Sequence, residues 1–274
     1  MVKYIPGNSN NPIIFNTYEI GIGSGNPYVT KWKYRGTQKQ YGLEINQFEK
    51  DPISLPLVFR FRGSLKEIKK NLDLFFQECE KDILLRKAGT LWINDWSIRG
   101  YFIERETIPS EEFYGNEMSA VFLAPYPFWT KTIEKEFSKQ STIEGDIGLD
   151  FDFDFAFDFA ADETGRASWS VDHYTKSHFK MKIYGPVDKP KILVNDYPYQ
   201  IHTTLKAGEY LTIDSRDNTV IKYLYDGKIE DIYNSRDFEY SVFEKMPSGL
   251  LNIIWSGEFG FELALFLERS EPKW

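Results

Sequence analysis

The chain has 274 residues, 42% hydrophobic and 27% charged, which is the balance of a folded protein with one large or two modest domains. A net charge of −8 argues against nucleic acid as a partner, because an acidic surface does not neutralise phosphates. The single cysteine excludes an intrachain disulfide framework, and no apolar run reaches the roughly 18 residues of a membrane helix. The opening MVKYIPGNSNNPIIF lacks the pattern of a secretory signal. We therefore expect a soluble protein made in a cytoplasm, without membrane insertion.

The first sixty residues predict short strands. Alternation is clearest in SLPLVFRFRG, where one face carries Leu55, Leu57, Phe59 and Phe61 and the other carries arginines. The aromatic content of 17% also favours β structure. GIGSG at residues 21–25 is not followed by the helix of a dinucleotide-binding motif, and we interpret it as a turn.

One amphipathic helix is predicted at about residues 64–86. Ser64 and Glu67 have the spacing of a capping box at its start. Apolar residues recur at helical spacing along one face, namely Leu65, Ile68, Leu72, Phe75, Phe76, Cys79 and Ile83. The opposite face is charged, so one side of the helix is expected to pack on a sheet. Cys79 lies within the apolar face, and we interpret it as a buried structural thiol rather than a nucleophile.

Strands are expected to resume after this helix. TLWINDWSIRGYFIERETI predicts a hairpin that turns at Asn94-Asp95, and GNEMSAVFLAPYPFW predicts a further strand. We interpret PYPFW at residues 125–129 as a packing anchor, with a sugar-stacking platform as the alternative. The polar run at residues 132–147 is expected to be a loop or link.

The run GLDFDFDFAFDFAAD, residues 148–162, alternates Phe with Asp. As a strand it places the Phe rings on one face and the carboxylates on the other. A calcium loop needs Gly at its sixth position, and counting from Asp150 or Asp152 gives Phe155 or Phe157. We therefore predict a one-sidedly buried strand at residues 149–159 with a solvated or interface-facing acidic row, and not a metal site.

The last hundred residues predict a β-sandwich. Seven or eight short alternating runs are separated by turns such as ND at 195–196 and DG at 226–227. His173, His178 and His202 do not form a defined ligand cluster, and we interpret each as a surface or loop residue. We expect no catalytic, cofactor-binding or metal-binding residue and no cofactor, since no nucleophile, phosphate-loop or carboxylate-pair pattern stands out.

The order of these features resembles a known family. The helix LKEIKKNLDLFFQECEKDILL, the hairpin LWINDWSIRGYFIE, the strand VFLAPYPFW and the tract LDFDFDFAFDF follow one another. This order is similar to that of the distal tail proteins of long-tailed, siphovirus-type phages and prophages of Gram-positive bacteria, over nearly the whole chain. The most specific part is PYPFW followed some twenty residues later by the Phe-Asp tract. Members often carry Pro within the tract, where this chain has Ala156.

The resemblance implies a mainly β fold with two domains. Residues 1–135 would be a ring-forming belt domain that carries the helix. Residues 136–274 would be a galectin-like β-sandwich entered through the Phe/Asp strand 149–159. We further expect strands around residues 58–62 and 118–123 to be sheet edges that join neighbouring subunits.

The resemblance also implies a structural, non-enzymatic role at the virion tail tip. A homo-hexameric ring would form a hub in the baseplate that joins the tail tube protein to the tail-associated fibre or lysin. Receptor-binding proteins for host attachment would dock at its periphery. The alternative is a carbohydrate-binding module for host cell-wall glycans. A glycan-degrading enzyme is disfavoured, because no acid/base pair can be singled out.

Overall fold

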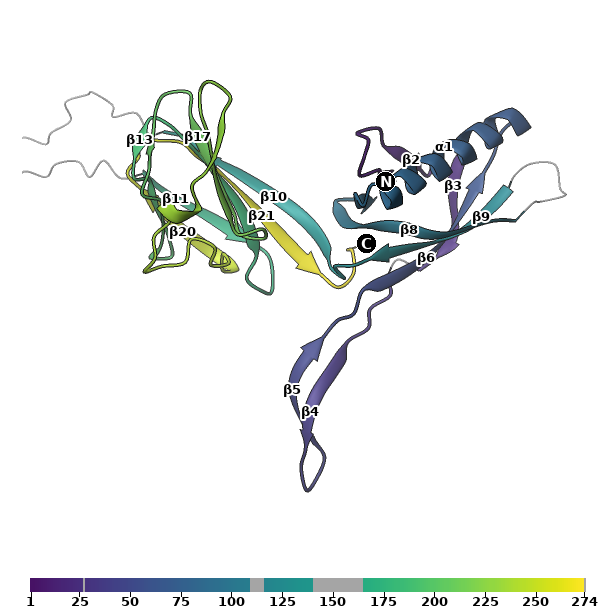
Figure 1. The fold of residues 1–274 in the computed structure, drawn as a ribbon. Helices are drawn as coiled ribbons and strands as arrows, with labels where there is room; N and C mark the ends of the chain where they lie inside the picture. The colour runs from purple at the N-terminus through teal and green to yellow at the C-terminus, as the bar shows by residue number, and fades with distance from the viewer. Residues whose placement is uncertain (27, 109–115, 140–164, 274) are drawn as a thin grey trace, which may run out of the picture. The chain divides into compact units, whose positions relative to one another are not determined.

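A computed structural model of the chain describes residues 1–26, 28–108, 116–139 and 165–273. The described residues form two compact units (Figure 1), of which the second spans Thr132–Leu267. The first unit comprises Met1–Lys131 together with residues 268–273, because the chain returns to it at its end. This division differs from the expected one, in which the whole C-terminus lay in the second domain.

The described residues of the first unit form one helix and mostly antiparallel strands. Its elements are β1 Val2–Ile5, β2 Ile13–Phe15, β3 Ile20–Gly25, β4 Lys33–Gln38, β5 Leu43–Glu49, β6 Ile53–Phe61, α1 Leu65–Leu84, β7 Gly89–Ile93, β8 Trp96–Ile108 and β9 Asn116–Ala124. Strand β10, Trp129–Phe137, begins in this unit and continues into the second. The predicted hairpin turn is confirmed, since Asn94 and Asp95 connect β7 to β8.

Strand β8 joins two sets of strands. Its first residues pair with β7 in the order β2-β1-β7-β8, and its later residues pair with β9 in the order β3-β6-β9-β8. The change of partner falls at Gly100 and Tyr101. A Cβ at Gly100 would lie 2.1 Å from the Leu123 carbonyl oxygen, so only glycine lets the two backbones approach this closely.

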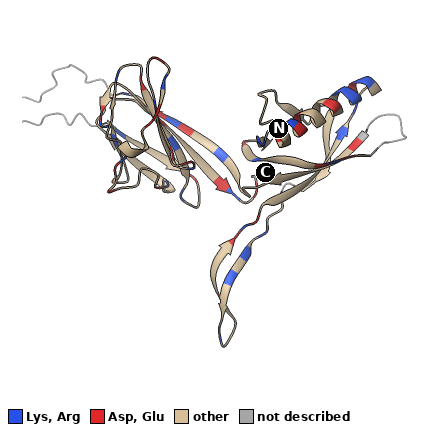
Figure 2. Cartoon of the chain, in the orientation of Figure 1, with Lys and Arg blue, Asp and Glu red and all other residues tan. Residues whose placement is uncertain are grey.

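Helix α1 packs one face on this sheet, as its pattern predicts. The capping box is present, with the Ser64 hydroxyl accepting from the Glu67 amide and the Glu67 carboxylate accepting from the Ser64 amide. Phe75 is fully buried, with ring centroids 5.0 Å from Phe102 and 5.6 Å from Phe59. Charged residues lie along the exposed side of the helix (Figure 2). Two predicted stripe residues at the helix ends, Leu65 and Ile83, are exposed instead.

The periodicity did not predict the buried acid of this helix. Asp82 is fully buried in the last turn, where the helix dipole disfavours a carboxylate. The Tyr4 hydroxyl and the Asn8 side-chain amide both donate to it, and the Asn8 backbone amide donates from 3.2 Å. Burial, and then the hydrogen bond to Asp82, raise the pKa of Tyr4, so the phenol keeps its proton. These donors tie the N-terminal segment to the end of α1.

Three local expectations for the first 140 residues are wrong. GIGSG is strand β3 and not a turn, and Gly23 is the extra residue of a bulge between the Ile22 and Ser24 pairings with β6. Residues 132–137 continue strand β10. The strands at residues 58–62 and 118–123 are not edges, because β6 lies between β3 and β9, and β9 lies between β6 and β8. In the order β3-β6-β9-β8, β3 lies at one end, outside β6.

The second unit is built of short strands, as the sequence predicts. Its elements are β11 Gly165–Val171, β12 His178–Tyr184, β13 Val187–Asp188, β14 Lys191–Val194, β15 Tyr197–Gln200, β16 Thr204–Leu205, β17 Tyr210–Asp214, β18 Thr219–Tyr223, β19 Ile229–Asp231, the 3₁₀ turn η1 Tyr233–Ser235, β20 Gly249–Trp255 and β21 Phe261–Arg269, which ends in the first unit. The chain is therefore mainly β. The Phe/Asp tract at 149–159 lies outside the described residues.

Two sheets of the second unit enclose its core. One has the order β19-β18-β17-β12-β21-β10, and the other has the order β11-β20-β14-β15. Alternate residues of β12 point inward, and Phe179 contacts Tyr199 of the other sheet with ring centroids 5.4 Å apart. Phe137 of β10 stacks on Phe261 at 4.5 Å. The even residues of β12 and β21 are left on the outer face of the first of these sheets.

Substitution of Tyr4 by Phe tests the buried Tyr4–Asp82 contact. The change removes one donor to a buried carboxylate and is expected to lower the free energy of unfolding by about 1–3 kcal/mol, measured by urea denaturation. Tyr18, which is 74% exposed, gives the matched control, and Tyr18→Phe is expected to change stability by about 0.5 kcal/mol or less. Equal stability of the two variants would contradict the assignment.

The thiol of Cys79 offers a second test. Burial raises its pKa to about 12, which leaves a thiolate fraction of roughly 10⁻⁴ at pH 8. We expect the folded protein to resist iodoacetamide at pH 8, and the protein in 6 M guanidinium to be alkylated at Cys79 within minutes. Rapid stoichiometric alkylation of the folded chain, followed by mass spectrometry, would show that the α1–sheet packing is wrong or opens readily.

Candidate assembly interface

The β4–β5 hairpin exposes several large apolar side chains in the first unit. Its strands pair only with each other among the described strands (Figure 1), with Tyr34 opposite Phe48 and Gly36 opposite Ile45. Tyr34 and Phe48 are each 60% exposed, and Leu43 and Ile45 are more than two-fifths exposed. An isolated two-stranded hairpin is marginally stable in water, so this segment gains from a covering surface.

Apolar side chains gather on one face of the hairpin. Asn46 is the extra residue of a bulge in β5, so Phe48, Ile45 and Leu43 lie opposite residues 34, 36 and 38 of β4, which share one face. Ion pairs line the same strands, with Lys33–Asp51 at 2.5 Å, Arg35–Glu49 at 2.9 Å and Lys39–Glu44 at 2.7 Å; Figure 2 shows basic residues on β4 and acidic ones on β5. Such exposed pairs contribute little stability, but their charges can determine the orientation and register in which a partner binds the hairpin.

An aromatic cluster lies at the base of the hairpin. The Trp32 ring is 6.5 Å from Phe48 and 6.2 Å from Phe128. The Lys50 ammonium sits 5.0 Å from the Trp32 ring centre and 4.8 Å from that of Phe128, and it donates to the Pro127 carbonyl. Desolvation lowers the pKa of Lys50, against a smaller opposing effect from Glu271. The cluster thus joins the hairpin base to the PYPFW segment.

PYPFW itself is partly an anchor. Trp129 is fully buried and Pro127 is buried, as expected of a packing segment. Tyr126 is half-exposed, and its ring lies 5.3 Å from Phe128. The burial of Trp129 means that its ring cannot serve as a sugar-stacking platform.

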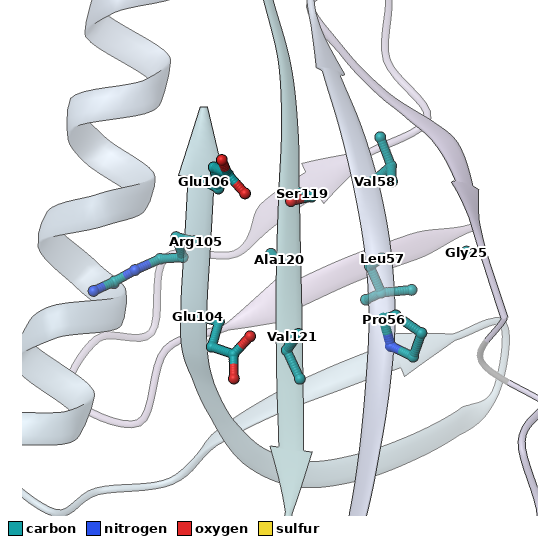
Figure 3. A pocket seen from close by; sticks show the side chains of 10 residues that line it. All are labelled: Gly25, Pro56, Leu57, Val58, Glu104, Arg105, Glu106, Ser119, Ala120 and Val121. Atoms are coloured by element: carbon teal, nitrogen blue, oxygen red, sulfur yellow. The ribbon is translucent and has the colours of Figure 1, made fainter. Parts of the chain in front are cut away.

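A hollow of about 530 Å³ lies on the sheet of β3, β6, β9 and β8 (Figure 3). Arg105 points away from it toward α1, where its guanidinium donates to the Phe76 carbonyl at 3.2 Å. The side chains of Glu104, Glu106 and Val121 lie along the strands of the hollow. Its mixture of two carboxylates with apolar side chains fits a contact surface better than a reaction site.

The other residues singled out by sequence lie in separate surroundings. His178 Nδ1 is 3.2 Å from the Ser215 hydroxyl, His173 packs on Tyr174 with ring centroids 4.5 Å apart, and His202 is exposed. Within residues 1–26, 28–108, 116–139 and 165–273, no three His, Cys, Asp or Glu side chains form a group that could hold a metal ion. In that same part of the chain, no helix has the length and apolarity needed to cross a bilayer.

Sequence comparison finds no relatives for this chain: no protein-family model matches it, and no curated protein matches it either. Solved structures do match. The Dit protein of phage SPP1, a paradigm of the hub of the adsorption apparatus in phages that infect Gram-positive bacteria, is 6% identical, with a TM-score of 0.60 over 98% of this chain and 99% of that chain.

Two baseplate structures of phage P2 also match. A chain of the baseplate in its activated conformation with calcium is 11% identical, with a TM-score of 0.63 over 99% of this chain and 100% of that chain. A chain of the baseplate with strontium is 11% identical, with a TM-score of 0.58 over the same shares. At these identities the likeness is one of fold. The chain thus has the β-rich fold of the phage tail-hub protein Dit from one end to the other.

Proposed function

We propose that this protein is a structural component of a phage tail tip, a hub of the distal-tail type. One observation carries the proposal: the fold match to a tail-hub protein spans both units and almost the full length of both chains. A shared sandwich domain alone would match only half of the chain. The residue order that resembles the distal tail proteins points to the same role.

We further propose that the hub is a homo-hexameric ring at the virion tail tip, made in the host cytoplasm. The first domain, residues 1–135 as expected from sequence, would build the ring against the tail tube protein. The sandwich would stand outside it, with the fibre or lysin below and receptor-binding proteins at the periphery. A ring needs two different surfaces on each subunit, so that the rotation between copies closes.

The β4–β5 hairpin supplies one of these surfaces. It offers an apolar face and unpaired strand edges, and a neighbouring copy can cover the face by packing and an edge by strand addition. The role is non-enzymatic in this proposal, and it draws on surface complementarity and not on a reaction site. The hairpin thus takes the place of the two interior strands as the proposed subunit contact.

Mass photometry of the purified chain tests the ring. Six copies of the 32.1 kDa chain weigh about 193 kDa, and two rings back to back weigh about twice that. We expect one of these species to appear as the concentration rises, and negative-stain electron microscopy to show closed rings. A chain that remains monomeric up to its solubility limit would contradict the proposal.

A double substitution of Tyr34 and Phe48 by Ser tests the hairpin. Both side chains are exposed, so the monomer is expected to fold, while the concentration at which rings form should rise about tenfold or more through lost apolar burial. Tyr18→Ser, at a more exposed site in the same unit, is the control and should assemble like the parent chain. Unchanged assembly of the double variant would exclude the hairpin as the contact.

A further inference from the structure

The outer face of one sheet in the second unit carries a polar groove. It has a volume of about 440 Å³, within the range of about 300–1,000 Å³ usual for ligand sites. It is formed by β10, β21, β12 and β17, and its lining residues are Glu134, Lys135, Glu136, Lys180, Lys182, Thr212, Glu262, Leu263 and Ala264. All of them belong to the second unit, so the groove is complete within one unit.

Strand register explains why this face is hollow. Lys182 lies between Glu262 on one side and Thr212 on the other, and Lys180 lies between Ala264 and Asp214. Thr212 and Ala264 are short, whereas the lysines and glutamates beside them are long. The short side chains therefore form the base of the groove, and the long polar side chains form its sides.

The lysine and glutamate at the centre of the groove are held in place. The Lys182 ammonium sits 4.6 Å from the Tyr184 ring centre and 4.5 Å from that of Tyr210, and the Tyr184 hydroxyl donates to Glu262. The Tyr210 ring is itself stacked at 4.5 Å on Tyr223. The hydrogen bond with Tyr184 raises the pKa of Lys182, which keeps the amine charged and donating. Because the donor and the acceptor are already fixed, the protein loses less side-chain entropy when a ligand binds.

The groove carries charges of both signs. The carboxylates of Glu134, Glu136 and Glu262 lie with the ammonium groups of Lys180 and Lys182, whereas the Lys135 ammonium donates to the Ser168 carbonyl of the other sheet at 2.7 Å. Such a set offers both acceptors and donors to hydroxyl groups, which need both.

We propose that this groove binds a short, uncharged oligosaccharide, with Glu262 accepting from and Lys182 donating to adjacent hydroxyl groups. The site is independent of the tail-hub role, because it uses the outer face of the sandwich and not the hairpin. A tail-tip protein with such a site would contact host glycans directly. Its failure would leave the ring proposal untouched.

A glycan microarray probed with the full-length chain gives the first test. The array carries uncharged oligosaccharides, including N-acetylated ones, beside phosphate-containing cell-wall polymers. We expect binding to uncharged members, and we expect titration calorimetry with the best of them to give a measurable affinity. Binding only to the phosphate-containing polymers, or to no glycan at millimolar concentration, would overturn the proposal.

Two nearly isosteric substitutions then locate the site. Glu262→Gln and Lys182→Met should each weaken binding of that oligosaccharide about tenfold or more, because each removes a charged hydrogen-bonding group. Lys176→Met is the matched control, since Lys176 is exposed, lies outside the groove and pairs with Glu244 at 2.7 Å. Unfolding temperature and ring mass should match the parent in all three variants. Undiminished binding in both groove variants would place the sugar elsewhere and overturn the assignment.

Discussion

The packing of Phe75 against the sheet determines how the helix and most strands of the first unit are arranged. Its ring lies within 5 to 6.5 Å of the rings of Tyr4, Phe59 and Phe102, and this contact sets which face of the sheet α1 covers. The face away from the helix is left with Glu104, Val121 and their neighbours. The Tyr4–Asp82 contact then holds the N-terminal strands against the helix end. Since a buried carboxylate without donors is costly, this polar contact specifies the arrangement as strongly as the apolar core does.

The hairpin obeys a different constraint. Its side chains have apolar surface that neither the helix nor the sheet covers, and its two strands complete no larger sheet among the described strands. In a monomer this hairpin is therefore only marginally stable, and association with another surface would stabilise it. The groove on the second unit is the opposite case, because its polar groups are already paired and oriented and its hollow can take a ligand without refolding.

The fold of this chain is similar to that of known proteins, whereas its sequence is not. Backbone architecture agrees with a tail-hub protein over nearly all of the chain at 6% identity. Burial at alternate positions can be met by many side chains, so a β fold persists when almost every residue has changed. The exposed residues that contact binding partners are not constrained by this pattern of burial. Hub assembly can therefore be proposed from architecture, whereas a ligand for the groove has to be argued from this chain's own side chains.

The sequence by itself determined the helix with its capping box, the alternating strand β6, the turn at Asn94-Asp95 and the mainly β class, because each follows from periodicity or turn chemistry within a few residues. Only the tertiary structure decided that β6 and β9 are interior strands, that GIGSG is a bulged strand, that Asp82 is buried under Tyr4, and that Lys182 and Glu262 stand side by side. These features depend on which strands pair and in what register. Pairing joins residues as distant in sequence as Val2 and Ile93, and the local pattern does not show which strands will pair.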